Sequence, residues 1–279
     1  MVNRIAILSD IHSNYEAFQA CVDDMQDKAI DYVVFLGDYI SDYAFPEKTM
    51  DLLYQVLAQY PSIAILGNRE EYFIHPDKTW RPSSQTGSLY YTYHHLRPED
   101  FAFIRALPKT AVLRFKNRPK ILLAHGSPAN TRELLLREKN NTHRWLDSIQ
   151  EKVLVCGHTH VPMIECWHNK MIMNPGSIGE NVCGQTDATY GLLVWENHQW
   201  QPSIQHVKYD YRKEQQRMLD SDLPETALYW AAATYKNLGT GRNEALLMLK
   251  RAKRSTANEM ISEEDFARAA SKLDIHLLR

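Results

Sequence analysis

The sequence is poor in cysteine and has none of the spacings that build cysteine frameworks. Only four cysteines occur in 279 residues, at positions 21, 156, 166 and 183, and no two of them form a CxxC pair. This excludes a small fold stapled by disulfides. We interpret Cys21, Cys156, Cys166 and Cys183 as reduced packing residues, although a disulfide between two of them is left open at this stage.

The sequence also lacks an excess of charge and a long hydrophobic run. It has 32 Lys and Arg against 34 Asp and Glu, a net charge of −2, so we expect no nucleic-acid polymer as partner. No apolar stretch approaches the roughly 20 residues of a membrane span. The N-terminus enters a strand pattern without the basic and apolar regions of a signal peptide. We therefore expect a cytoplasmic protein that binds no membrane.

What the sequence does contain is a series of apolar stretches that each end in polar residues. The five segments are IAILSDIH, YVVFLGD, IAILGN, ILLAHG and VLVCGHTH. Their polar ends supply seven candidate metal ligands: Asp10, His12, Asp38, Asn68, His125, His158 and His160. A side chain at the end of a buried strand is held rigidly and faces the edge where α/β sheets bind ligands. The pattern predicts a ligand site at such an edge.

The first seventy residues alternate between strand and helix patterns. Apolar runs at 3–8, 32–36 and 62–66 predict strands buried on both faces. Apolar residues at helical spacing predict helices after the first run and at 47–59. Ser13 and Glu16 have the spacing of a capping box, so we expect the first helix to start at Ser13. Right-handed crossovers would bring the strand ends to one edge.

The rest of the chain predicts hairpins and then a helical end. We expect helices near 97–106 and 131–149, strands at 110–115, 120–124 and 153–156, and hairpin strands up to about residue 207. The segment 76–95 is rich in Pro, Ser and aromatic residues and is expected to be a loop or short helix beside the site. From 208 onward the pattern is helical. This predicts two units, a domain at 1–207 and a helical extension at 208–279 packed on it.

The candidate ligands indicate which metals they would bind. Carboxylate and amide oxygens with imidazoles, and no thiolate, favour Mn²⁺, Fe or Zn²⁺ over Cu(I) or iron–sulfur chemistry. Seven ligands are too many for one ion. Two ions roughly 3.5–4 Å apart that share one carboxylate would use them all and hold a bridging hydroxide that is nucleophilic near neutral pH. Glycines at 37, 67, 126 and 157 stand beside these ligands and allow a close approach.

Taken together, the five blocks resemble the calcineurin-like metallophosphoesterase superfamily. They read Asp10-Ile11-His12, Gly37-Asp38, Gly67-Asn68-Arg69-Glu70, His125-Gly126 and Gly157-His158-Thr159-His160, in the family's order, with Asn174-Pro175-Gly176-Ser177 as a further loop. The resemblance covers residues 4 to about 207. It implies an α/β fold, a four-layer α/β/β/α sandwich of two mixed sheets, to which the C-terminal helices would be an appendage.

The resemblance also implies the cofactors and their ligands. Two divalent ions are expected, with Mn²⁺ favoured over Fe, Zn²⁺, Ni²⁺ or Co²⁺. By similarity, the first ion would be bound by Asp10, His12 and His160, and the second by Asn68, His125 and His158. Asp38 would bridge the two ions.

The third block departs from the family pattern, which usually reads Gly-Asn-His. Here the position of the histidine is Arg69, which stays charged and cannot donate a proton near neutral pH. We expect Arg69 to bind phosphate oxygens and, with Asn68 and His158, to stabilise the transition state. Without a strong general acid, good leaving groups should be favoured over alkyl phosphomonoesters. The resemblance is closest to the small bacterial phosphodiesterases and asymmetric diadenosine tetraphosphate hydrolases of the superfamily.

The leading hypothesis is a hydrolase of phosphodiester or phosphoanhydride bonds in a small phosphorylated substrate, such as a nucleotide or a dinucleoside polyphosphate. A phosphomonoesterase or protein phosphatase of the same superfamily is one alternative. Another is a non-catalytic metal-binding scaffold, since one retromer subunit resembles the superfamily in this way. The sequence does not indicate an oligomeric state.

Several roles have two interpretations from the sequence. Asn68 can start a helix with Glu71 as well as bind a metal. His94 and His95 either pack or, with the tyrosines around them, stack on a nucleobase. Arg132 either reaches the substrate phosphate or lies on a helix surface.

Overall fold

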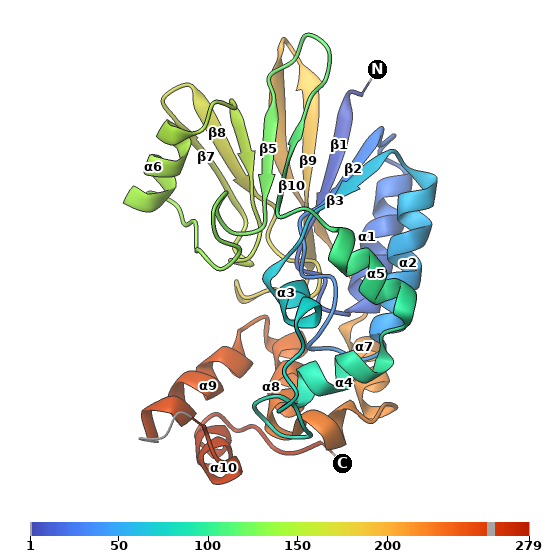
Figure 1. Ribbon diagram of the computed structural model, residues 1–279, viewed down its shortest axis with the longest axis vertical. Coiled ribbons are helices and arrows are strands. Elements are labelled where there is room, and N and C mark those ends of the chain that lie inside the picture. Colours follow the sequence, from blue (N-terminus) through green and yellow to red (C-terminus); the bar gives the residue numbers. More distant parts are fainter. Residues whose placement is uncertain (1, 256–259, 279) are drawn as a thin grey trace.

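The protein is built on two five-stranded mixed sheets, and the computed structural model describes residues 2–255 and 260–278 (Figure 1). In spatial order the first sheet consists of β10 (Gln199–Val207), β9 (Ala188–Glu196), β1 (Arg4–Leu8), β2 (Tyr32–Phe35) and β3 (Ser62–Ala64). The second consists of β4 (Thr110–Leu113), β5 (Ile121–Ala124), β6 (Val153–Val155), β8 (Lys170–Asn174) and β7 (Met163–Trp167).

Strand direction changes along the chain as the sequence predicts. β1, β2 and β3 run parallel, as do β5, β6 and β8, so each set ends at one edge of its sheet. The later strands form antiparallel hairpins, β7 with β8 and β9 with β10. The β9–β10 hairpin joins the first sheet through antiparallel pairing of β9 with β1. The predicted change from crossovers to hairpins is confirmed.

Helices cover the outer faces of both sheets, and a hydrophobic core lies between the sheets. α1 (Tyr15–Gln26), α2 (Pro46–Gln59) and α5 (Pro98–Ala106) lie against the first sheet, and α6 (Asn140–Ser148) lies against the second (Figure 1). Ile5, Ile7 and Val34 from one sheet pack between the layers with Leu123 and Val155 from the other. The predicted four-layer α/β/β/α sandwich is confirmed.

The described residues beyond β10 are helical. They form α7 (Tyr211–Leu219), α8 (Leu223–Thr240), α9 (Glu244–Ser255) and α10 (Glu263–Ser271), which lie below the strand ends in Figure 1. α7 packs on α1, and α8 packs on α4 (Gly87–His95), the short helix within the segment 76–95. Ala233, Met248 and Phe266 belong to a separate small core of these helices. Among the described residues, no helix has the length and apolar character needed to cross a membrane.

The cap residues of two helices differ by one position from the capping boxes that the sequence suggests. α1 is capped by Asn14, whose side chain accepts the Ala17 N–H, because the Ser13 hydroxyl instead accepts the Ser41 N–H. α3 (Asn68–Ile74) is preceded by Gly67 as its cap residue, and the side chain that reaches back to the Gly67 N–H is Glu70. Asn68 is therefore the first helical residue, and its amide is available to the site.

The helix predicted at 131–149 is also too long. Only α6 is helical there, and residues 131–139 form an irregular loop. Three consecutive leucines point in different directions in this loop: Leu135 is buried in the core of the second sheet, whereas Leu134 and Leu136 line a cavity. A regular helix would not place these three side chains in that way.

Candidate metal centre

The seven predicted ligands come together where the strands end. Asp10 and His12 follow β1, Asp38 follows β2, Asn68 begins α3 after β3, His125 follows β5, and His158 and His160 follow β6. The two sheets thus contribute to one site at the shared edge, above α8 in Figure 1. Asp10, His12, Asp38, His125 and His160 are buried, while His158 is partly exposed.

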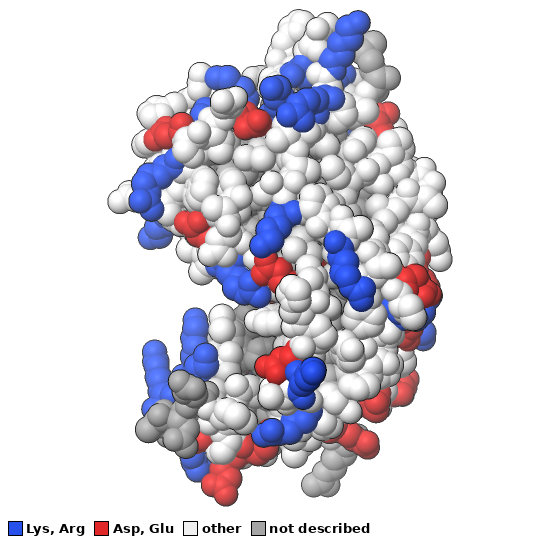
Figure 2. All heavy atoms as spheres, in the orientation of Figure 1, with Lys and Arg blue, Asp and Glu red and all other residues white. Residues whose placement is uncertain are grey.

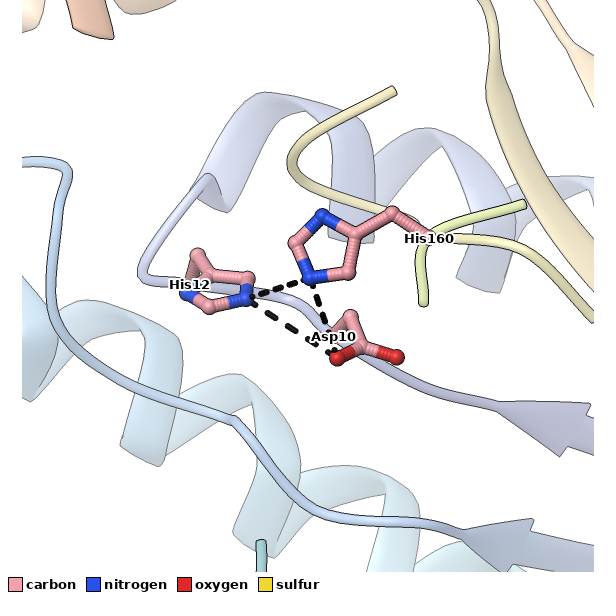
Figure 3. Close-up of side chains that lie close together, drawn as sticks. All are labelled: Asp10, His12 and His160. Atoms are coloured by element: carbon pink, nitrogen blue, oxygen red, sulfur yellow. Dashed lines mark hydrogen bonds and ion pairs between the residues drawn. The ribbon is translucent and has the colours of Figure 1, made fainter. Parts of the chain in front are cut away.

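Asp10, His12 and His160 form one compact group (Figure 3). The Nε2 atoms of His12 and His160 are 3.2 Å apart, and the Oδ1 atom of Asp10 lies 3.2 Å from His160 Nε2 and 3.9 Å from His12 Nε2. Three ligand atoms therefore point at one small volume. We refer to these residues as the first ligand group.

Asp38, His125 and His158 form a second group, which Asn68 completes. His125 Nε2 lies 3.4 Å from Asp38 Oδ1 and 3.0 Å from Asn68 Oδ1. The other carboxylate oxygen, Asp38 Oδ2, faces the first group at 3.8 Å from His12 Nε2. Asp38 therefore presents one oxygen to each group, which is the geometry that a bridging carboxylate requires.

Three of the histidines are held by their Nδ1 atoms, which leaves Nε2 free to bind a metal. His12 Nδ1 is 3.0 Å from Asp42 Oδ2, His125 Nδ1 is 2.8 Å from the Leu36 carbonyl, and His160 Nδ1 is 2.9 Å from the Glu180 carbonyl. Carbonyls and carboxylates accept hydrogen bonds, so each Nδ1 carries the proton. Such contacts fix the tautomer and ring direction of metal-binding histidines.

The backbone at the ligands is held in a sparsely populated conformation. Five candidate ligands have φ between 54° and 66°: Asp10, His12, Asp38, His158 and His160. Non-glycine residues rarely adopt this region, and such conformations concentrate at functional sites. Close packing at the same edge requires glycine, because a Cβ on Gly67 would lie 2.3 Å from Asp38 Oδ1. A Cβ on Gly157 would lie 2.8 Å from Asp10 Oδ2.

The protonation of the site follows from its buried charges. Burial opposes ionisation of Asp10, but the charges of His160 and His125 prevail and lower its pKa to about 2. Burial also disfavours a charged His125, yet Asp38 and Asp10 raise its pKa to about 9, and Asp10 does the same for His160. For His158, burial and the neighbouring His125 lower the pKa to about 4. A cation at the site would replace the protons on His125 and His160.

The donor set fits a metal, and one atom shows this directly. Asp10 Oδ2 accepts hydrogen bonds from the Ser9 hydroxyl at 2.5 Å and the His158 N–H at 3.1 Å. The other oxygen, Oδ1, is buried and has no hydrogen-bond partner among the described residues, although three imidazole Nε2 atoms lie within 4.0 Å of it. A buried carboxylate oxygen without a donor is costly, and a cation removes that cost.

Arg69 lies at the site but is paired. One guanidinium nitrogen is 2.8 Å from Asp42 Oδ2, and its backbone N–H donates to Asp38 Oδ1 at 2.8 Å. Burial works against its charge, but Asp42 and Asp38 raise its pKa further above the ordinary value. Arg69 is therefore a fixed cation. Its side chain also lines the cavity above the ligands.

Several residues around the ligands were not anticipated from the sequence. Asp42 contacts both His12 and Arg69, and Glu180 contacts His160. Glu70 is fully buried and accepts the N–H groups of Gly67, Asp38 and Tyr39. Asp42 lies four residues after Asp38 with no flanking strand pattern, so the sequence gives no signal for it.

The structure gives the contacts of Arg132, His94 and His95, each of which has two interpretations from the sequence. Arg132 pairs with Glu71 and donates to the Asn68 carbonyl at 3.2 Å, in a loop and not on a helix. His94 and His95 contact the carbonyls of Tyr90 and Tyr91 in the preceding turn of α4. His94 lines a separate cavity of about 420 Å³ with Trp80 and Tyr93, away from the ligand groups.

A cavity of about 430 Å³ opens above the two ligand groups. Its floor includes His12, Asp38, Asn68 and His158. Its walls are largely apolar and come from both parts of the molecule: Leu134, Leu136 and Val182 on the sandwich side, and Trp230 and Leu246 from α8 and α9. In Figure 2 a hollow separates the upper part of the molecule from the helices below it, and both basic and acidic side chains lie around its opening.

The chain is similar in sequence or structure to several known proteins. An uncharacterized protein of Methanocaldococcus jannaschii is 23% identical over 242 residues, which cover 79% of this chain and 94% of that protein. A hypothetical protein from Pyrococcus horikoshii has a similar structure, with a TM-score of 0.74 and 19% identity over 85% of this chain and 98% of that chain. A metallophosphoesterase from Sphaerobacter thermophilus aligns with a TM-score of 0.69 and 22% identity over 86% of this chain and 100% of that chain.

The similarities to the Pyrococcus horikoshii and Sphaerobacter thermophilus structures concern the fold. The family itself is shown by the sequence, because the profile of the calcineurin-like phosphoesterase superfamily domain matches residues 4–198. The chain belongs to the calcineurin-like phosphoesterase superfamily.

Proposed function

We propose that the protein is a dinuclear metal-dependent hydrolase of phosphodiester or phosphoanhydride bonds in small organic phosphates. One observation supports this most directly: two ligand groups face one another across Asp38, whose two oxygens lie toward different groups. Asp10, His12 and His160 would hold one divalent ion, and Asn68, His125 and His158 the other. Mn²⁺ is the ion we favour by resemblance to the superfamily. The donor set, which mixes oxygens with imidazoles and has no thiolate, suits Mn²⁺ and also Fe or Zn²⁺.

Bound there, the ions would polarise a phosphate ester and supply water activated as a nucleophile near neutral pH. The protein groups around them have separate tasks. The Arg69 guanidinium would bind a phosphate oxygen with the donors that Asp42 does not occupy. The Asn68 amide and the His158 ring, which both line the cavity floor, would stabilise charge that develops in the transition state.

The cavity supports a substrate with an organic part beside its phosphate. Its volume of about 430 Å³ lies in the range of sites for nucleotide-sized molecules. The Arg69 guanidinium, which lines the cavity, would attract an anion, and the apolar walls would cover an aryl or nucleoside group. With Arg69 in place of a proton donor, substrates with good leaving groups are favoured. Dinucleoside polyphosphates meet these requirements.

The first experiment measures hydrolysis of bis(p-nitrophenyl) phosphate by the purified protein before and after chelation. We expect chelation to abolish activity and Mn²⁺ to restore it better than Zn²⁺, Ni²⁺ or Co²⁺. Asp38→Ala and His125→Ala should each be inactive. Asp147→Ala and His168→Ala are matched controls, because these residues form an exposed pair with each other. Full activity in Asp38→Ala would refute the mechanism, and a protein that binds no metal would favour a scaffold.

A second experiment addresses the substrate. A dinucleoside tetraphosphate is compared with cyclic nucleotides, p-nitrophenyl phosphate and a phosphoprotein, and the products are separated by chromatography. We expect release of a nucleoside triphosphate and a nucleoside monophosphate from the first. Faster hydrolysis of the monoester or the phosphoprotein would instead indicate a phosphomonoesterase or protein phosphatase.

A further inference from the structure

We infer that Trp230 and Asn237 of α8 are positioning residues for the first ligand group. Each donates a hydrogen bond to a buried acidic residue, and that residue in turn holds one of the two histidines of the group. The helices that follow the sandwich would therefore set the metal affinity of one site and not of the other. The inference rests on the proposed function only in that the ligand groups bind metal.

The first connection runs from Trp230 through Asp42 to His12. The indole N–H of Trp230 donates to Asp42 Oδ1 at 2.8 Å. The other oxygen of Asp42 accepts the Nδ1 proton of His12 at 3.0 Å. Asp42 is 1% exposed, so water does not compete for these contacts. Ser41 and Arg69 also bind Oδ2, so Trp230 supplies one of several restraints.

The second connection runs from Asn237 through Glu180 to His160. The amide nitrogen of Asn237 donates to Glu180 Oε1 at 2.6 Å. Its amide oxygen accepts the Glu244 N–H at 2.7 Å, which fixes the direction of the amide. Glu180 accepts the Nδ1 proton of His160 on its backbone carbonyl at 2.9 Å, and its Oε2 atom lies 3.5 Å from the same nitrogen. Losing Asn237 would leave a buried carboxylate free to shift.

Both donors lie on one face of α8. They are seven residues apart, two helical turns, so their side chains point the same way. The helix is sharply kinked just before this stretch, at Leu228, where φ is 46° and ψ is −120°. Such a backbone is strained for leucine. The helical turn that follows this strained residue contains Trp230, which contacts Asp42.

The second ligand group has a different support. The Nδ1 atom of His125 is held by the carbonyl of Leu36, at the end of β2. The oxygens of Asp38 lie next to the N–H of Arg69 and the rings of His12 and His125. None of these contacts involves α8. A change at Trp230 or Asn237 should therefore act on one site selectively.

The test measures Mn²⁺ affinity and stoichiometry, by calorimetry and by metal analysis after dialysis, in Trp230→Phe and Asn237→Ala. Loss of a residue that contacts a metal ligand directly typically lowers metal affinity 10- to 100-fold. Trp230 and Asn237 act one contact further from the metal, so we expect a loss at the lower end of that range, about 10-fold, at one of two sites and none at the other. Trp167→Phe is the matched control, since Trp167, on the edge strand β7, also donates its indole N–H to an aspartate, Asp147 of α6.

Two backgrounds identify the affected site. In His125→Ala the first group keeps its ligands, and adding Trp230→Phe should weaken binding of the remaining ion about 10-fold. In His160→Ala the second group keeps its ligands, and the same addition should change nothing. Equal weakening in both backgrounds, or no weakening in either, would overturn the inference. A wild-type protein that binds no Mn²⁺ would instead overturn the proposed function, on which the inference depends.

Discussion

Arg69 occupies a position at which protonation of the leaving group would otherwise be expected. Its guanidinium is anchored to Asp42 at 2.8 Å and lines the cavity beside Asn68. Because its pKa is raised above an already high value by Asp42 and Asp38, it supplies constant positive charge and no proton. The rate of hydrolysis should therefore depend strongly on the pKa of the leaving group.

We predict that Arg69→Met lowers kcat for bis(p-nitrophenyl) phosphate by roughly 10²- to 10³-fold, the usual effect of removing one donor to a developing oxyanion. Steady-state kinetics on metal-loaded protein measure this. Arg217→Met is the control, because Arg217 pairs with Glu16 on the α1–α7 side of the molecule. Arg69→His should reduce the difference in kcat between substrates with aryl and with alkyl leaving groups, since imidazole can donate a proton. An unchanged kcat in Arg69→Met would show that Arg69 serves only to hold Asp42.

At the level of elements, α7 is fixed to α1 through a buried acid. Glu214 is fully buried, and one of its oxygens accepts the Glu16 N–H at 3.3 Å. The other oxygen has no partner among the described residues. Burial raises the pKa of Glu214 to about 8, although the Glu16 N–H and the charge of Arg217 act in the opposite direction.

This contact makes stability depend on pH. Between pH 4.5 and about 8 the folded protein keeps a proton on Glu214 that the unfolded chain has released. The free energy of unfolding therefore falls as pH rises through that range, by at most about 1.4 kcal/mol per pH unit for this group. Glu214→Gln should make the free energy of unfolding fall less steeply with pH, as measured by urea unfolding at pH 5, 6.5 and 8. Glu225→Gln, on an exposed part of α8, should keep the wild-type dependence on pH. Parallel slopes for Glu214→Gln and wild type would contradict this account.

The elements also show what the sequence could and could not predict. Strands followed by polar ends are local patterns, so the candidate ligands at 10, 12, 38, 68, 125, 158 and 160 could be named from the sequence, and the fold brings them together. Asp42 and Glu180 were missed because their roles come from neighbours distant in sequence, His12 and His160. The loop at 131–139 was predicted as helix because consecutive leucines fit a helix pattern as well as the split packing that the structure shows.

For the whole molecule, the cavity lies between the sandwich and the helices that follow it. Leu134 on one side and Leu246 on the other are 50% and 39% exposed, and both line the cavity. Exposed leucines on opposite walls would lose contact with water when an organic group enters between them. Selection among substrates would then depend on both parts of the chain, while the chemistry depends on the strand ends.

This arrangement can be tested with two diesters that share the p-nitrophenolate leaving group but carry either a phenyl or a methyl group on the retained oxygen. Leu246→Asn should raise KM for the phenyl diester roughly 3- to 10-fold, because part of a leucine side chain is no longer covered, and should leave the methyl diester and both kcat values nearly unchanged. Leu247→Asn is the matched control, since the next residue on α9 is 44% exposed but does not line the cavity. An equal effect of both variants on both diesters would show that α9 contributes general stability and no selectivity, and the apolar wall would then have no role in substrate choice.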